Sequence, residues 1–164
     1  IGDRRQRQMC IRDRIMNVIY LASDHGGTVL KAHIAEHLDP KGYEVRDLGV
    51  NGTESVDYPD YAASLAQVML HDATARGILI CGSGIGISIA ANRFSHIRAA
   101  LVTDVTSARL CRQHNDANVL ALGERLTGVA TAMECVDTFL STDFEGGRHQ
   151  RRVDKLISPQ PASS

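Results

Sequence analysis

Residues 77–93 read GILICGSGIGISIAANR, an apolar run that passes through alternate glycines into a second apolar segment. The run 77–82 shows no polar alternation, which is typical of a strand buried on both faces of a parallel sheet. The glycines predict a tight turn, and residues 85–93 predict a short helix that begins at once. The stretch therefore indicates one strand–turn–helix unit of an α/β protein.

The same alternation continues on both sides of this unit. Further strand patterns occupy 17–22, 43–49, 97–102 and 118–123. Helical patterns run from Gly27 to 38, over 60–72, from 103 or 104 to about 114, from Thr127 onward, and over 146–157. Strands that alternate with helices through short turns predict a three-layer, Rossmann-like α/β fold, a five-stranded parallel sheet with helices on both faces.

Three segments of different character divide the chain. We expect a single domain over 16–157, because no repeat or change of composition interrupts it. Residues 1–15, IGDRRQRQMCIRDRI, show no strand or helix periodicity and predict a non-native or disordered extension, with an arginine-rich targeting segment as the alternative. Residues 158–164, SPQPASS, predict a disordered tail.

Composition argues against several classes of protein. Hydrophobic residues make up 43% of the 164, yet no apolar run reaches the roughly 18 residues of a membrane span. The formal net charge of −1 argues against a nucleic-acid partner, which needs a basic face. The four cysteines form no C-x-x-C pair and no cluster with histidine at zinc spacing, so we expect no metal and no cofactor. Such cysteines indicate reduced thiols in a soluble, cytoplasmic protein.

Open parallel sheets bind ligands at the carboxyl ends of their strands, where Cys81 lies. The glycines after it let backbone N–H groups approach an anion, and the start of the next helix adds a positive field that also favours a thiolate. The loop thus offers a base beside an oxyanion cradle. Taken alone, the pattern fits a tight turn beside a buried cysteine better.

Two other stretches place polar residues at the same edge. SDHGG (23–27) puts Asp24 and His25 at the end of the first strand, although a helix cap beside a surface histidine is the commoner explanation. HNDANVLALGER (114–125) puts His114 just before the fifth strand and Arg125 just after it. These residues could bind sugar hydroxyls, transfer protons or bind an anion.

A basic segment near the C-terminus, GGRHQRR (146–152), holds Arg148 and Arg152 four residues apart. This spacing puts both guanidinium groups on one face of a helix, where they suit a phosphate. A solvated basic helix end is the common alternative.

A nucleotide-dependent oxidoreductase is a second interpretation of the glycine turn. Its G-x-G-x-x-G pattern is incomplete, because Ile87 occupies the third glycine position. Asp104, about 20 residues further on, could still act as the acid that binds a ribose.

Five motifs in a fixed order resemble those of the type B ribose-5-phosphate isomerases and the related galactose-6-phosphate isomerase subunits. They are ASDHGG, DYPDYA, ILICGSGIGISIAANR, RQHNDANVLALGER and EGGRHQRRV, and the resemblance extends from Met16 to about Lys155. It implies an aldose–ketose isomerase that acts on ribose 5-phosphate and ribulose 5-phosphate through an enediolate, without a metal. It also implies a homodimer, possibly a tetramer, with each active site built across the interface.

The resemblance assigns a role to each motif. Cys81 would be the base that moves a proton between C1 and C2, as in the branch of the family that does not use a glutamate for this step. His114 would open the furanose ring with Asn115 beside it. Ser83, where many relatives have threonine, would assist the loop amides. The residues implied to bind the enediolate, the sugar and the phosphate are Gly82, Ser83, Gly84, Ile85, Gly86, Asp24, Tyr58, His25, Arg125, Arg148 and Arg152.

Two further alternatives stay open at this point. A six-carbon substrate such as allose or galactose 6-phosphate is one, because the sequence does not reveal the depth of loop 49–58. A non-catalytic phosphosugar-binding module is the other, although such a module would not need Cys81 or His114. Finally, Asp24 and Cys81 can share a site only if the first and third strands are neighbours.

Overall fold

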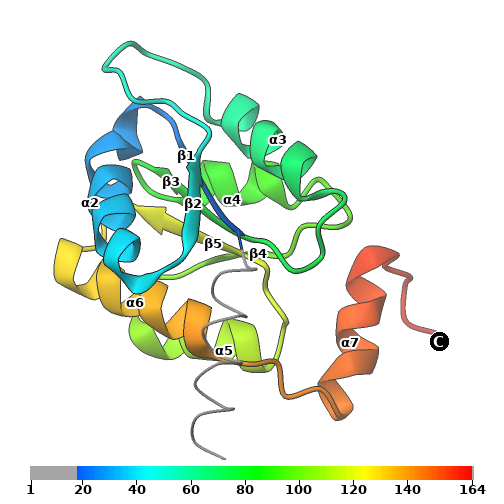
Figure 1. Ribbon diagram of the computed structural model, residues 1–164. Coiled ribbons are helices and arrows are strands. Elements are labelled where there is room, and N and C mark those ends of the chain that lie inside the picture. Colours follow the sequence, from blue (N-terminus) through cyan, green and yellow to red (C-terminus); the bar gives the residue numbers. More distant parts are fainter. Residues whose placement is uncertain (1–17, 164) are drawn as a thin grey trace, which may run out of the picture.

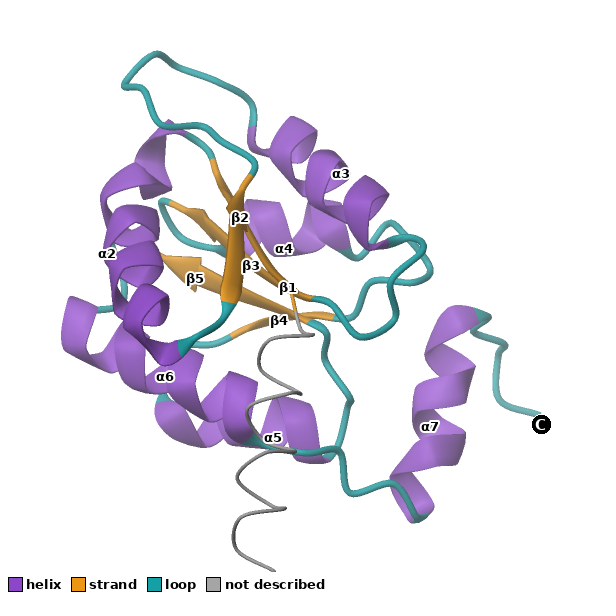
Figure 2. Cartoon of the chain, in the orientation of Figure 1, coloured by secondary structure: helices purple, strands orange, loops and turns teal. Residues whose placement is uncertain are grey.

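The computed structural model describes residues 18–163, so the predicted extension at 1–15 lies outside the described part. Its centre is a five-stranded sheet in the order β2-β1-β3-β5-β4, in which every neighbouring pair is parallel (Figures 1 and 2). The strands are β1 (Val18–Ser23), β2 (Glu44–Asp47), β3 (Arg76–Cys81), β4 (Ala99–Leu101) and β5 (Val119–Gly123). The five parallel strands and the predicted fold class are thus confirmed.

The first and third strands are neighbours, as a shared site for Asp24 and Cys81 requires. Ser23 of β1 pairs with Ile80 of β3, and Cys81 pairs with Gly123 of β5. The ends of β1, β3 and β5 therefore meet at one edge of the sheet. β2 and β4 lie at the two outer edges, which explains why β2 is largely exposed.

Helices cover both faces of the sheet (Figure 1). The helices α2 (Thr28–Leu38), α5 (Val105–Gln113) and α6 (Val129–Ser141) pack on one face, against a core that includes Ile78 and Ile80. The helices α3 (Tyr58–Met69) and α4 (Ile85–Ala91) pack on the other face, against Leu79 and Cys81. Successive side chains of β3 point to opposite faces, so the continuous apolar run fills both cores.

Two helix boundaries differ from the sequence expectation. α3 begins at Tyr58 instead of residue 60, and Pro59 lies in its first turn. Backbone N–H groups in the first turn have no partner within the helix, so the missing N–H of a proline costs no hydrogen bond there. α6 begins at Val129, two residues after the expected start at Thr127, and Gly128 occupies its N-cap position. Asp104 caps α5 as expected, because its Oδ1 accepts a hydrogen bond from the Ser107 amide at 2.7 Å.

The last helix, α7 (Arg148–Ile157), stands apart from the three layers (Figures 1 and 2). Only His149 and Val153 of this helix are buried, while Leu156 and Ile157 are about half exposed. The residues from Pro159 to Ser163 form no helix or strand and are exposed. Within 18–163, no helix is both long and apolar enough to cross a bilayer.

Candidate active site

A cleft of about 490 Å³ lies at the carboxyl ends of β1, β3 and β5. Its walls come from the end of β1, the first turn of α3, the loop after β3 and the loop after β5. The lining residues are Asp24, Tyr58, Cys81, Gly82, Ser83, Ile85, Gly86, Arg125 and Leu126. All but Leu126 were predicted site residues, which the fold therefore brings together.

Cys81 forms the floor of this cleft at the last position of β3. Its side chain is 4% exposed, and its Sγ accepts a hydrogen bond from the backbone amide of Gly84 at 3.1 Å. A sulfur that carries negative charge accepts such a bond more strongly than a neutral thiol does. Cys81 is thus placed to take up and return a proton while remaining largely shielded from water.

The loop after Cys81 approaches its neighbours too closely for side chains at two positions. A Cβ on Gly84 would lie 2.6 Å from the Leu101 side chain, and the residue has a left-handed φ of 77°. A Cβ on Gly86 would lie 2.6 Å from the phenol ring of Tyr58. Tyr58 therefore packs directly on the start of α4, which forms one side of the cleft. Ser83 supports the same turn, because its Oγ accepts a hydrogen bond from the Ile85 amide at 3.2 Å.

The sequence leaves two roles open for Asp24, a helix cap and a residue of the site, and its position is compatible with both. Its Oδ1 accepts a hydrogen bond from the Gly26 amide at 2.9 Å, so it caps the short 3₁₀ turn His25–Gly27. The carboxylate also lines the cleft and is 7% exposed.

His25 lies just outside the cleft lining. It is exposed, and its Nδ1 accepts a hydrogen bond from the Val56 amide at 3.1 Å. Because a backbone N–H can only donate, the neutral ring carries its proton on Nε2, which points away from the loop as a donor. Loop 49–57 thus fixes the orientation of this ring.

Arg125 closes the cleft from the side of β5. Its exposed side chain passes over Gly82, and its amide donates to the Gly82 carbonyl at 3.0 Å. Glu124, beside it, accepts a hydrogen bond from the Leu30 amide at 2.7 Å and so caps the first turn of α2. This contact ties the β5 loop to the helix that follows Asp24 and His25. The sequence does not predict this contact, because a cap supplied from 94 residues away leaves no local pattern.

A second group of predicted residues gathers elsewhere in the chain. His114, at the end of α5, and Asn115 line a smaller cavity of about 280 Å³ together with Arg152 of α7. This cavity and the Cys81 cleft share no lining residue. Arg148 lines neither, and it is exposed on α7. Within one chain, the structure therefore does not bring the predicted base and the predicted ring-opening residue together.

His149 of α7 also belongs to this second group, although the sequence assigned it no role. Its ring stacks on the ring of His114 with a centroid separation of 4.4 Å and an interplanar angle of 17°. Burial lowers the pKa of His149, and the nearby His114 and Arg148 lower it further. The four-residue spacing of His149 and Val153 in a predicted helix was the available signal, because that spacing marks the inner face of α7.

The second group also contains the one set of side chains in 18–163 that could hold a metal ion. The ligand atoms of His114, Glu145 and His149 all lie within 4.8 Å of one another. The sequence predicts no metal site, and the 30 residues between His114 and Glu145 mean that this set leaves no local pattern.

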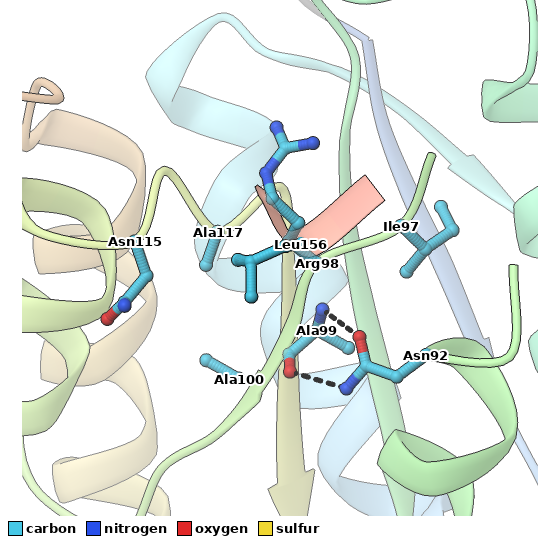
Figure 3. Close-up of a pocket in the computed structure, with 8 residues that line it drawn as sticks. All are labelled: Asn92, Ile97, Arg98, Ala99, Ala100, Asn115, Ala117 and Leu156. Carbon is cyan, nitrogen blue, oxygen red and sulfur yellow. Dashed lines mark hydrogen bonds between the residues drawn. The ribbon is translucent and has the colours of Figure 1, made fainter. Parts of the chain in front are cut away.

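A third cavity, of about 410 Å³, lies between β4 and α7 (Figure 3). The Asn92 carboxamide pairs with both backbone groups of Ala99, with its Nδ2 donating at 2.9 Å and its Oδ1 accepting at 2.8 Å. The Arg98 guanidinium donates to the Asp116 carbonyl at 2.7 Å. The polar groups of this cavity are thus largely engaged in hydrogen bonds that fix the edge strand. The Cys81 cleft therefore remains the better candidate for chemistry.

Comparison with known proteins identifies the family of the chain. A profile of the Ribose/Galactose Isomerase family matches residues 19–156. Ribose-5-phosphate isomerase B of Escherichia coli is 48% identical over 143 residues, which cover 87% of this chain and 96% of that protein.

Solved structures are also similar. Ribose-5-phosphate isomerase B of Clostridium thermocellum is 52% identical, with a TM-score of 0.83 and coverage of 85% of this chain and 95% of that one. The Mycoplasma genitalium enzyme with bound ribulose-5-phosphate is 46% identical, with a TM-score of 0.85 and coverage of 87% and 95%. From the profile match and these identities together, the chain belongs to the Ribose/Galactose Isomerase family.

Proposed function

We propose that this protein interconverts ribose 5-phosphate and ribulose 5-phosphate as an aldose–ketose isomerase. The observation that carries the proposal is the buried Cys81 thiol in a cleft that Asp24 and Arg125 also line, with its Sγ accepting a hydrogen bond from a loop amide. A non-catalytic binding module would not need such a nucleophile. Family membership and the ribulose-5-phosphate bound to the Mycoplasma genitalium relative support the same substrate.

The reaction needs one proton to move between adjacent carbons. The Cys81 thiolate removes the C2 proton of the open-chain aldose, which leaves a cis-enediolate, and the thiol then returns a proton to C1 to give the ketose. Backbone amides of the 82–86 loop stabilise the oxyanion, with Ser83 assisting proton transfer between O1 and O2. Asp24 and Tyr58 bind the sugar hydroxyls. Backbone donors can supply this stabilisation in place of a metal ion.

Ring opening belongs to the second group of residues, whereas phosphate binding draws on both groups. His114 protonates the ring oxygen of the furanose, with Asn115 beside it. His25, Arg125, Arg148 and Arg152 bind the phosphate through charge-assisted hydrogen bonds. The cavity that holds His114 and the Cys81 cleft are separate within one chain, so His114 acts with Cys81 where this cavity meets the Cys81 cleft of another molecule.

A homodimer with shared active sites satisfies this requirement. A row of partly exposed apolar side chains runs along the start of α3 and the outer face of α4, beside the Cys81 cleft. It consists of Tyr58 (39% exposed), Ile85 (49%), Ile89 (59%) and Phe94 (37%). A second copy of the chain is the occupant we propose for this face, and a tetramer built from such dimers is compatible with it.

The described cysteines, which form no disulfide, support a cytoplasmic location. Cys81, Cys111 and Cys135 are all free and buried. Free thiols persist where the compartment is reducing.

A panel of sugar phosphates tests the substrate. The metal-free protein should isomerise ribose 5-phosphate with a higher kcat/KM than allose or galactose 6-phosphate, and exhaustive chelation should leave that rate unchanged. Faster turnover of a six-carbon aldose phosphate would reassign the substrate within the family. Loss of activity with EDTA and recovery with Mn²⁺ would disprove stabilisation by amides alone. A protein that binds these sugars without turnover would be a binding module.

A further inference from the structure

We propose that His114, Glu145 and His149 form a binding site for a first-row transition-metal dication, Zn²⁺ above all. Occupation of this site would inhibit the enzyme. The inhibitory consequence rests on the proposed role of His114 in ring opening, whereas the site itself rests on geometry alone. It lies at the end of α5 and the start of α7, away from the Cys81 cleft of the same chain.

Backbone hydrogen bonds fix the relative positions of the segments that carry the three side chains. The Glu145 amide donates to the Gln113 carbonyl at 3.1 Å, which joins the segment before α7 to the last turn of α5. The buried Arg112 reinforces this junction, because its Nε donates to the Thr142 carbonyl at 3.1 Å and its NH1 to the Ala117 carbonyl at 2.7 Å. The His149 amide donates to the Gly146 carbonyl at 3.0 Å, which closes the turn into α7.

The donor set suits a tetrahedral metal with one open position. Two imidazole nitrogens and one carboxylate oxygen make up a common three-ligand set for Zn²⁺. Ligand atoms around Zn²⁺ lie roughly 3.3–3.5 Å apart, because each bond is about 2.0–2.1 Å long. The three ligand atoms already lie within 4.8 Å of one another. His114 is half-buried, so rotation of its ring out of the stack with His149 can complete the approach.

The surroundings determine which ions compete. Imidazole ligands disfavour Mg²⁺ and Ca²⁺, which prefer oxygen, and favour Zn²⁺, Ni²⁺ and Cu²⁺. Arg148 and Arg152 lie close enough to His149 to influence its charge, so they also repel a dication. We therefore expect binding that is weaker than in a structural zinc site and reversible by chelators.

Direct metal binding by the full chain is the primary test. Titration of the chelator-treated protein with Co²⁺, followed by its visible absorption, and with Zn²⁺, followed by calorimetry, should show one site per chain. Glu145→Gln and His149→Gln should each weaken binding by at least about 10-fold, since even partners outside the coordination shell have effects of that size. Cys81→Ala and His71→Gln are the matched controls and should bind as the original protein does. Unchanged affinity in both Glu145→Gln and His149→Gln, or loss of the site in Cys81→Ala, would overturn the proposal.

Activity measurements test the consequence separately. Zn²⁺ should inhibit ribose 5-phosphate turnover, and EDTA should restore it. Glu145→Gln should keep its metal-free activity and require at least about 10-fold more Zn²⁺ for the same inhibition. If no sugar phosphate is isomerised while the metal titration still shows the His114–Glu145–His149 site, the proposed function fails and the site stands. If Zn²⁺ occupies the site without slowing turnover, its inhibitory role is wrong.

Discussion

Cys81 differs in its surroundings from the two other cysteines that the structure describes. Cys111 of α5 and Cys135 of α6 belong to the hydrophobic core, and burial raises the pKa of each to about 11. Cys81 instead lines the cleft and receives a hydrogen bond from the Gly84 amide. Reactivity of a cysteine depends on access, and among the three described cysteines Cys81 is the one that lines this cleft.

Alkylation at neutral pH should therefore be selective among the three cysteines of the described part. Iodoacetamide should modify Cys81 and stop turnover, substrate should protect it, and Cys111 and Cys135 should stay unmodified until the protein unfolds. Peptide mass spectrometry measures this directly. Cys81→Ala should lose at least about 100-fold in turnover, the usual contribution of a positioned proton-transfer group, while still binding substrate. Activity within about tenfold of the original protein would remove Cys81 from the role of base.

His114 is assigned to a different step, which isotope exchange can separate from proton transfer. The His114→Asn variant should still exchange the C1 hydrogen of ribulose 5-phosphate with D₂O, because that ketose is linear and Cys81 is intact. Its net turnover of ribose 5-phosphate should fall by about 100-fold, since the furanose is no longer opened. Proton NMR follows both processes in one sample, and Cys81→Ala should lose both. Loss of exchange in His114→Asn would place the histidine in proton transfer instead.

At the scale of elements, one buried lysine joins α2 to β2 and the loop that follows. Lys31 is 1% exposed, and its Nζ donates to Asp47 Oδ1 at 2.6 Å, to the Val50 carbonyl at 2.6 Å and to Asn51 Oδ1 at 2.8 Å. The same loop supplies the Val56 amide that orients His25. Lys31 thus anchors the start of a segment whose far end reaches the candidate site.

Removal of this ammonium should destabilise the fold. Lys31→Met leaves the Val50 carbonyl and the Asn51 carboxamide without their buried donor, which should cost about 1–3 kcal/mol in the free energy of unfolding. Lys41→Met is the control, because Lys41 forms an exposed ion pair with Asp137 at 3.2 Å, and such pairs contribute about 0–1 kcal/mol. Urea unfolding of the two variants compares them. Equal stability would show that solvent replaces the three contacts of Lys31.

The arrangement of strands and helices shows what the sequence could predict and what it could not. The order of strands and helices follows from hydrophobic periodicity, and the meeting of Asp24 with Cys81 follows from the parallel order of β1 and β3. The start of α3 at Tyr58 was missed because Pro59 was taken as part of a loop, although proline is common in a first turn. The stacking of His149 on His114 depends on how α7 docks, and no local pattern encodes that contact.

At the scale of the whole molecule, the separation of two site halves within one chain leads to a decisive experiment. In a two-fold symmetric dimer with shared sites, each site takes Cys81 from one chain and His114 from the other. A mixed dimer of Cys81→Ala and His114→Asn chains then has one site with both lesions and one site with neither. If each chain built its own site, every site in the mixed dimer would carry one lesion.

Complementation of the two inactive variants should consequently restore activity. After dissociation and reassociation of an equal mixture, about one quarter of all sites should be intact, because half of the dimers are mixed and each has one complete site. The recovered activity should appear only under conditions in which subunits exchange, and its KM should equal that of the original protein. The matched control is a mixture of Cys81→Ala with the double variant Cys81→Ala/His114→Asn, in which no site can be complete. Recovery in the test mixture alone would establish that a partner supplies His114. Absence of recovery, with mixed dimers demonstrated by mass spectrometry, would mean that α5 and α7 move within one chain to bring His114 to Cys81.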